Sequence, residues 1–133
     1  MTPLVLLAED NAGDVDLLQL AFSEAGVPIE FDVARDGRSA LSRLQHAAEH
    51  GGGGYALILL DLNLPGVGGI ELLGFAKAQP TLHAIPVVIM TSSDHPRDRE
   101  RALAGGADAY HLKPFGFAGY APIIAQLVRS LPG

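Results

Sequence analysis

Hydrophobic residues follow two alternating patterns along the chain. Short apolar runs, which are typical of strands buried on both faces, cover residues 4–8, 55–60 and 85–90, and residues 29–34 and 109–112 can form two further strands. Between these runs, apolar residues recur three and four positions apart, as they do in amphipathic helices. The alternation predicts an α/β fold, in which a five-stranded parallel sheet carries helices on both faces. Right-handed crossovers leave few topologies, and among them we expect the flavodoxin-like strand order 2-1-3-4-5.

Capping and helix-breaking residues predict where several helices begin. Asn11 and Asp14, three residues apart, predict the N-cap of the first helix. The Ser-Ser-Asp segment at 92–94 predicts the start of the fourth helix. A proline inside a helix costs about 3 kcal/mol, so we expect the last helix to begin near Gly119, with Pro122 in its first turn.

Composition and charge exclude several classes of protein. The chain has 133 residues and no cysteine, so it can hold neither a disulfide nor a thiolate metal site. The net charge is −6, from 15 acidic and 9 basic side chains, which argues against binding of nucleic acid. No apolar run approaches the roughly 20 residues of a membrane helix, and the N-terminus lacks the basic region of a signal peptide. We therefore expect a cytoplasmic protein without nucleic-acid or membrane partners.

Polar side chains stand at the ends of four predicted strands. They are Glu9 and Asp10 after the first strand, Asp61 after the third, Thr91 and Ser92 after the fourth, and Lys113 after the fifth. Because parallel strands place their carboxyl ends on one edge of the sheet, we expect these side chains to converge. Three carboxylates repel one another unless a cation intervenes, and a set of oxygen ligands suits Mg²⁺.

Such a crevice fits phosphoryl transfer. Asp61, held on a rigid strand, can act as a nucleophile toward phosphorus and form an aspartyl phosphate. The Lys113 ammonium and Mg²⁺ can neutralise phosphoryl oxygens, and the Thr91 hydroxyl can donate a hydrogen bond to one of them.

Four segments carry a resemblance that spans essentially the whole chain, namely LLAEDN, LILLDLNLPG, PVVIMTSS and YHLKPF. In this order and spacing they resemble the response-regulator receiver domain of the CheY-like family. The resemblance implies that Asp61 accepts a phosphoryl group from a sensor histidine kinase, with Mg²⁺ as cofactor, in a signalling protein that is not an enzyme. The segments AEDN and LDLNLPG most resemble those of single-domain regulators paired with bacterial phytochrome-type kinases.

The resemblance also implies a role for each residue of the site. By it, the metal ligands are Glu9, Asp10, Asp61 and the backbone carbonyl of Asn63, the switch residues are Thr91 and Tyr110, and the phosphate contacts are Ser92 and Lys113. The same resemblance implies a cis peptide bond between Lys113 and Pro114. Gly68 and Gly69 depart from the Asp-Gly pair usual in the family, and we expect this to loosen the start of the third helix without touching the chemistry.

The expected domain organisation leaves the output to the surface of the domain. We expect residues 1–133 to form a single receiver domain without an output domain, so that its own surface acts on a partner. By the resemblance, that surface is the face of the fourth helix, the fifth strand and the fifth helix. Phe117, Tyr120 and Ile123 are expected to be exposed there as an apolar patch that forms a homodimer.

Other interpretations stay open at this point. A phosphorylation-independent pseudo-receiver has the same fold, although such modules commonly lose one or more of the residues that are intact here. A phosphatase of the haloacid-dehalogenase type also uses an Asp nucleophile and Mg²⁺, but the second Asp that it needs two residues on is Asn63 here. Taken singly, the polar residues could be helix caps or turn residues, an interpretation that we prefer for Asn11 and Ser93. His46 and His50 have a zinc-like spacing, but nothing completes a site, so we expect a solvated surface.

Overall fold

The apolar runs form the strands of one parallel sheet. In the computed structural model, which describes residues 2–131, the strands are β1 (Leu4–Ala8), β2 (Glu30–Ala34), β3 (Tyr55–Leu60), β4 (Val87–Thr91) and β5 (Ala109–Leu112). Every neighbouring pair is parallel, and the order across the sheet is β2-β1-β3-β4-β5. The fold class and the strand order predicted from the sequence are therefore confirmed.

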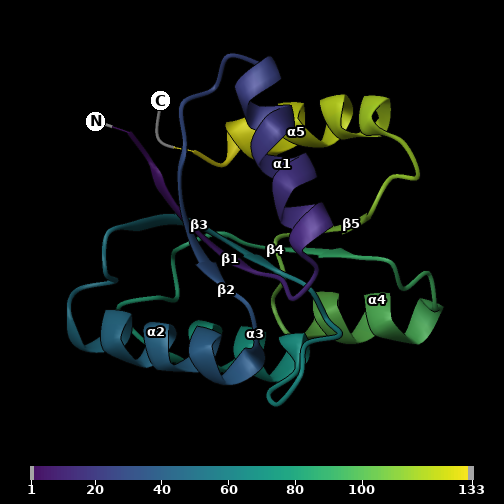
Figure 1. The fold of residues 1–133 in the computed structure, drawn as a ribbon. Coiled ribbons are helices and arrows are strands. Elements are labelled where there is room, and N and C mark those ends of the chain that lie inside the picture. Colours follow the sequence, from purple (N-terminus) through teal and green to yellow (C-terminus); the bar gives the residue numbers. More distant parts are fainter. Residues whose placement is uncertain (1, 132–133) are drawn as a thin grey trace.

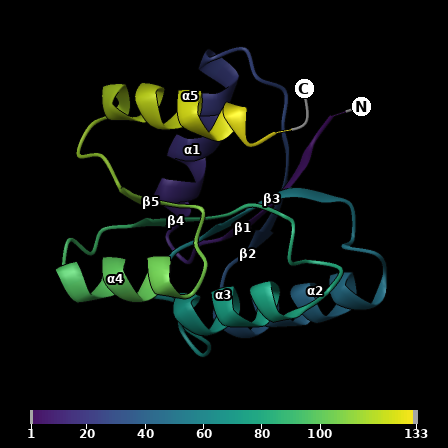
Figure 2. The same cartoon turned by 180° about the vertical axis from the view of Figure 1, so that it is seen from behind.

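Five α-helices cover the two faces of this sheet. They are α1 (Ala12–Glu24), α2 (Gly37–Glu49), α3 (Gly69–Ala78), α4 (Pro96–Ala104) and α5 (Tyr120–Arg129), with a short 3-10 turn at Phe117–Gly119 before the last. Helices α1 and α5 lie on one face, and α2, α3 and α4 lie on the other (Figure 1 and, from behind, Figure 2). Within residues 2–131, no helix has both the length and the apolar character needed to cross a lipid bilayer.

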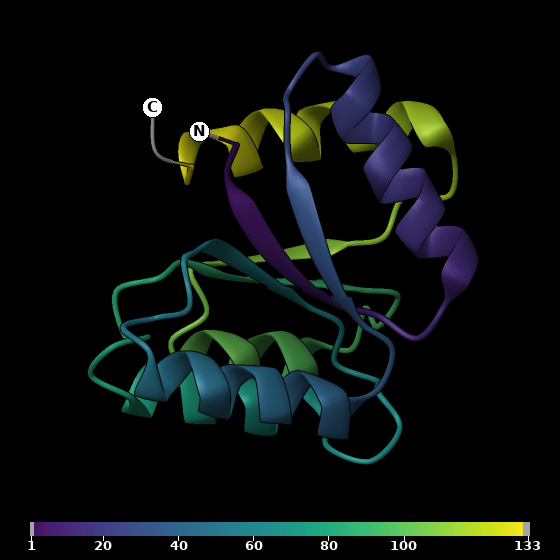
Figure 3. The same cartoon turned by 60° about the vertical axis from the view of Figure 1, so that its left-hand side comes forward.

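The sheet separates two hydrophobic cores, and alternate residues of each strand supply them. On β3, for example, Ile58 and Leu60 pack with α2 and α3, whereas Leu57 and Leu59 pack with α1 and α5. All four are fully buried, and burying such a side chain contributes roughly 1.5–3 kcal/mol. Burial on both faces explains why the central strands β1, β3 and β4 are continuous apolar runs. Figure 3 shows the sheet held between the two layers, which makes its strand ends a rigid platform.

The predicted starts of the first and last helices are confirmed. Asn11 is the N-cap of α1, and its Oδ1 accepts a hydrogen bond of 3.0 Å from the backbone N–H of Asp14. Helix α5 begins at Tyr120 after the cap residue Gly119, so Pro122 lies in its first turn, where a proline removes no helical hydrogen bond.

The predicted start of the fourth helix is wrong. Residues 92–94 lie in a loop, and α4 begins at Pro96 with His95 as its N-cap. The ring Nδ1 of His95 accepts a hydrogen bond of 3.1 Å from the backbone N–H of Arg97. The proline decides the boundary, because its fixed φ and missing N–H suit the first position of a helix.

Two predictions about the segment after β5 are also wrong. Every described peptide bond is trans, including Lys113–Pro114. The two isomers of an X–Pro bond differ by only about 0.5–1 kcal/mol, so the dipeptide alone does not decide between them. Of the three residues expected in an exposed patch, Tyr120 is 2% and Ile123 9% exposed, and only Phe117 is open to solvent at 40%. Tyr120 and Ile123 are buried because their side of α5 packs on the sheet and α1.

Candidate functional site

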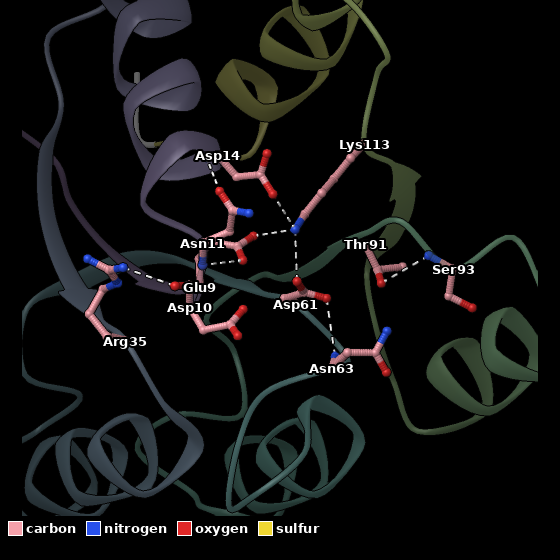
Figure 4. A network of polar contacts seen from close by, with 10 residues as sticks. All are labelled: Glu9, Asp10, Asn11, Asp14, Arg35, Asp61, Asn63, Thr91, Ser93 and Lys113. Atoms are coloured by element: carbon pink, nitrogen blue, oxygen red, sulfur yellow. Dashed lines mark hydrogen bonds and ion pairs between the residues drawn. The ribbon is translucent and has the colours of Figure 1, made fainter.

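The carboxyl ends of the strands converge on one edge of the sheet, as the sequence predicts (Figure 4). The backbone hydrogen bonds of the sheet continue into the site. The N–H of Asp61 donates to the carbonyl of Ala8 at 3.0 Å, and the N–H of Lys113 donates to the carbonyl of Thr91 at 2.8 Å. The sheet itself therefore fixes the Cα positions of an acid and a base that lie 52 residues apart in the sequence.

The Lys113 ammonium lies among three carboxylates, as Figure 4 shows. Its Nζ is 2.6 Å from Glu9 Oε1, 2.8 Å from Asp14 Oδ2 and 2.8 Å from Asp61 Oδ2. Burial by itself would lower the pKa of Lys113, but the hydrogen bonds to these carboxylates outweigh it and raise the pKa. The lysine therefore stays charged, with an acidic partner for each of its three N–H donors.

Asp61 is oriented through both of its carboxylate oxygens. Oδ2 accepts from Lys113 at 2.8 Å, and Oδ1 accepts from the backbone N–H of Asn63 at 3.2 Å. Asp61 is only 6% exposed, whereas Asn63 is exposed beside it. These contacts hold the carboxylate at the end of a buried strand, with the Asn63 loop next to it.

Helix α3 begins directly against the backbone of Asp61. A Cβ atom at Gly69 would lie 2.3 Å from the carbonyl oxygen of Asp61 and 2.8 Å from the Cα of Leu62. The N–H of Gly69 donates to the carbonyl of Leu62 at 3.0 Å. Gly69 is thus a packing requirement of the site, and the prediction that the Gly-Gly pair only loosens the helix start overlooked it.

Three acidic side chains form a group suited to a divalent cation. Glu9, Asp10 and Asp61 each offer a carboxylate oxygen, and these oxygens lie within 4.8 Å of one another. Burial, and then the nearby charge of Asp61, raise the pKa of Glu9 from 4.5 to about 7, although Lys113 opposes this shift. Hard oxygen donors held this close favour Mg²⁺ or a similar ion, because a dication relieves their repulsion. The donor set therefore fits the predicted metal.

The polar residues after β4 form a second group beside the acids. Thr91 is fully buried, and its Oγ1 accepts a hydrogen bond of 3.3 Å from the backbone N–H of Ser93. Ser92 is exposed. Tyr110 is buried, its hydroxyl donates to the carbonyl of Ser93 at 2.8 Å, and the Arg99 guanidinium lies 5.7 Å from its ring centroid. The loop after β4 thus connects the predicted switch residues Thr91 and Tyr110.

Two contacts of the site were not predicted from the sequence. Asp14 binds Lys113, and the Arg35 guanidinium donates to the backbone carbonyl of Asp10 at 2.9 Å. Asp14 stands four residues before the buried Leu18, so it occupies the inward-facing stripe of α1. That position was the signal that could have identified it. Arg35 gave no comparable signal, because it is an exposed residue after an edge strand.

A family model of the response regulator receiver domain matches residues 5–121 of the chain. The chain belongs to this receiver family. Among its relatives, the polar-differentiation response regulator DivK of Brucella ovis is 35% identical over 133 residues, which cover 100% of this receiver and 98% of DivK.

Two solved structures of response regulators are similar to this receiver domain. The phosphorylated cyanobacterial phytochrome response regulator RcpA is 33% identical with a TM-score of 0.83, covering 96% of this chain and 91% of RcpA. The Mn²⁺-bound response regulator Rcp1 is 31% identical with a TM-score of 0.85, covering 98% of this chain and 99% of Rcp1. A divalent cation therefore binds a protein of closely similar fold.

Other relatives are longer than the matched region. The match spans 74% of the regulator FilR2 of Methanothrix harundinacea and 46% of HprR of Escherichia coli. The shared part in each case is the receiver region described above.

Proposed function

We propose that this receiver takes a phosphoryl group from a sensor histidine kinase onto Asp61 in a Mg²⁺-dependent reaction. The observation that carries the proposal is the contact of 2.8 Å between Lys113 Nζ and Asp61 Oδ2, beside the acidic group of Glu9, Asp10 and Asp61. A carboxylate beside a fixed cation and a set of oxygen donors supports phosphoryl transfer at this site.

The transfer requires little covalent chemistry from the protein beyond the nucleophile. An oxygen of Asp61 attacks phosphorus, and the new O–P bond forms as the P–N bond of the phosphohistidine breaks, so that the histidine leaves with the electron pair. Lys113 stabilises the negative charge on the phosphoryl oxygens, and Thr91 and Ser92 supply donors to the product. Glu9, Asp10, Asp61 and the backbone carbonyl of Asn63 would hold Mg²⁺, which when bound would neutralise further charge on the phosphoryl oxygens.

The proposed switch acts through the loop after β4. When the Thr91 hydroxyl turns to the phosphoryl group, it must give up the N–H of Ser93. The Tyr110 hydroxyl donates to the backbone carbonyl of the same Ser93. A shift of Ser93 therefore weakens the hydrogen bond that holds the Tyr110 ring in place. The change reaches the face of α4, β5 and α5, and it alters the affinity for a partner by a population shift.

Similarity and exposed side chains support a choice of kinase partner and of output surface. Similarity to RcpA supports a kinase of the phytochrome type. Exposed apolar side chains on and next to the face of α4, β5 and α5 support a homodimer. Its contacts would be Leu103, Leu112 and Phe115, because most of the predicted apolar patch is buried. Leu103 and Leu112 are 44% and 48% exposed, and Phe115 is fully exposed. Light scattering of the wild type and of Leu112→Glu, with and without phosphorylation, tests the dimer. A monomer under every condition would contradict it.

The test of the main proposal is intact mass spectrometry after incubation with acetyl phosphate and Mg²⁺. We expect one added phosphoryl group, absent from Asp61→Asn and absent when EDTA removes the metal. Wild-type protein that takes no phosphoryl group from acetyl phosphate or from a phosphorylated histidine kinase would favour the pseudo-receiver instead.

A further inference from the structure

Asp14 reaches into the site from a different element than the other acids. It lies in the first turn of α1, 99 residues from Lys113 in the sequence, and its side chain is 29% exposed. Its Oδ2 accepts a hydrogen bond of 2.8 Å from Lys113 Nζ. In Figure 4 it approaches the ammonium from the side of α1, opposite the Asn63 loop.

The three acidic partners of Lys113 have different duties. Asp61 is the reacting group, and Glu9 belongs to the group of metal-type oxygens. Asp14 is outside that group. It is therefore the partner of Lys113 that neither binds the metal nor reacts. An ammonium with three N–H donors needs such a partner to keep its orientation when the others turn to new ligands.

Asp14 is itself held in place by a closed ring of contacts. Its backbone N–H donates to Asn11 Oδ1 at 3.0 Å, and the N–H of Asn11 donates to Glu9 Oε2 at 3.2 Å. Lys113 closes the ring, since it contacts both Asp14 and Glu9. The cap of α1 and the lysine of the site are therefore parts of one structure.

We propose that Asp14 is a positioning residue, which fixes the Lys113 ammonium so that one N–H stays directed at Asp61 and at the phosphoryl group arriving there. The inference rests on the proposed function, because it concerns the same phosphoryl transfer. It adds a residue on α1 to the residues that the transfer needs.

The test compares three variants under the acetyl phosphate assay. Asp14→Asn keeps the shape and one acceptor oxygen but removes the charge, and Asp14→Ala removes the acceptor altogether. Asp16→Asn makes the same charge change at an exposed residue of the same helix, and it serves as the matched control. We expect the maximal rate to fall about 10- to 100-fold in Asp14→Ala and less in Asp14→Asn, because misplacing a charge-stabilising group costs factors of this size.

Two further measurements separate positioning from general damage. The affinity for Mg²⁺, measured by calorimetry, and the half-saturating acetyl phosphate concentration should change by less than about threefold, since Asp14 acts on orientation. The ¹⁵N–¹H signal of the Lys113 ammonium should be visible in wild type and Asp16→Asn, where the hydrogen bonds slow its exchange with water. It should be lost or shifted in both Asp14 variants. If Asp14→Ala does not fold, Asp14→Asn carries the same test.

The outcomes distinguish the inference from the proposed function. Asp14 variants that react like Asp16→Asn, or that retain the wild-type ammonium signal, overturn the inference while the receiver itself works. A Mg²⁺ affinity that falls as much as the rate overturns it as well, because Asp14 would then act through the metal. A wild-type protein that accepts no phosphoryl group overturns both.

Discussion

Replacing Gly69 by alanine should damage the fold and the site together. The added methyl group would lie 2.3 Å from the carbonyl oxygen of Asp61 and 2.8 Å from the Cα of Leu62. Both neighbours are backbone atoms, so no flexible side chain can move aside. The N–H of Asp61 donates to the carbonyl of Ala8 within the sheet at 3.0 Å, which resists movement of Asp61. The strain therefore falls on the start of α3 and on Asp61, the proposed phosphoryl acceptor, together.

The size of the effect follows from the overlap. An ordinary carbon–oxygen contact is about 3.4 Å, so the backbone must separate by roughly 1 Å, and overpacking of this kind costs about 1–3 kcal/mol. We expect the upper end, about 3 kcal/mol, because a strand and a helix start must both move. For a chain of this length that corresponds to a Tm lower by roughly 10 °C. Displacement of Asp61 should also slow phosphorylation about 10- to 100-fold.

Two other glycines of the same segment provide controls. A Cβ at Gly68 would be 3.6 Å from the carbonyl of Leu62, an ordinary contact, and a Cβ at Gly74 would meet nothing within 4 Å. Gly68→Ala meets no clash and should cost no more than about 1 kcal/mol, because Gly68 is the N-cap of α3 and alanine is a poorer cap than glycine. Gly74→Ala, in the exposed middle of α3, should stabilise by about 0.5–1 kcal/mol. Urea unfolding followed by circular dichroism measures all three. If Gly69→Ala unfolds within about 1 kcal/mol of Gly68→Ala, the packing argument is refuted.

Three further predictions concern charge in the site. Lys113→Met leaves a cluster of carboxylates without its cation, so the metal-free protein should lose about 2–4 kcal/mol of unfolding free energy. Mg²⁺ should restore part of this loss. Equal urea midpoints for the variant and the wild type would contradict the prediction. Burial raises the pKa of Glu9 from 4.5 to about 7 in the native state. Between pH 4.5 and 7 the native protein therefore binds a proton at Glu9 that the unfolded chain does not. Metal-free stability should therefore rise by about 3 kcal/mol as the pH falls from 8 to below 4.5, measured as the difference between wild type and Glu9→Gln, whereas a flat difference curve opposes it. Mg²⁺ at 100 times its Kd should add about 2.7 kcal/mol to the wild type and much less to Asp10→Asn, as a thermal shift would show; equal shifts would remove Asp10 from the metal site.

The fold could be predicted because a sheet covered on both faces produces a distinctive sequence. Its strands must be apolar on both sides, as in Leu57–Leu60, and its helices only on one. The start of α4 was mispredicted because Ser92, Ser93 and Asp94 are all good caps, and the choice among cap residues was made by Pro96.

The buried side of α5 is a case where periodicity was not sufficient. The spacing of Ile124, Leu127, Val128 and Leu131 predicts one buried side. The helix instead buries Tyr120 and Ile123 with the first two, leaves Val128 37% exposed, and is followed by a partly buried Leu131. The sequence is apolar on both neighbouring sides of this helix. Only the packing against α1 and the sheet selects between them, and that contact joins opposite ends of the chain.

Asp14 was not assigned to the site for a related reason. Its local pattern, three residues after Asn11, is that of a helix cap, and the structure contains that cap. The same residue also neutralises Lys113, a contact that depends on strand order and not on any nearby sequence. Because the cap explains Asp14 locally, only its place on the inward-facing stripe of α1, four residues before Leu18, pointed to a second role.

The charges of the site are balanced in part by its own residues. Lys113 is the cation for Glu9, Asp14 and Asp61, and burial raises the pKa of Glu9 to about 7, which lowers the negative charge of the site near neutral pH. Asp10 is exposed, so water solvates the charge that remains. The unbalanced charge thus lies at the open edge of the site, where we expect a divalent cation to bind, while Lys113 and Asp14 stabilise the closed side.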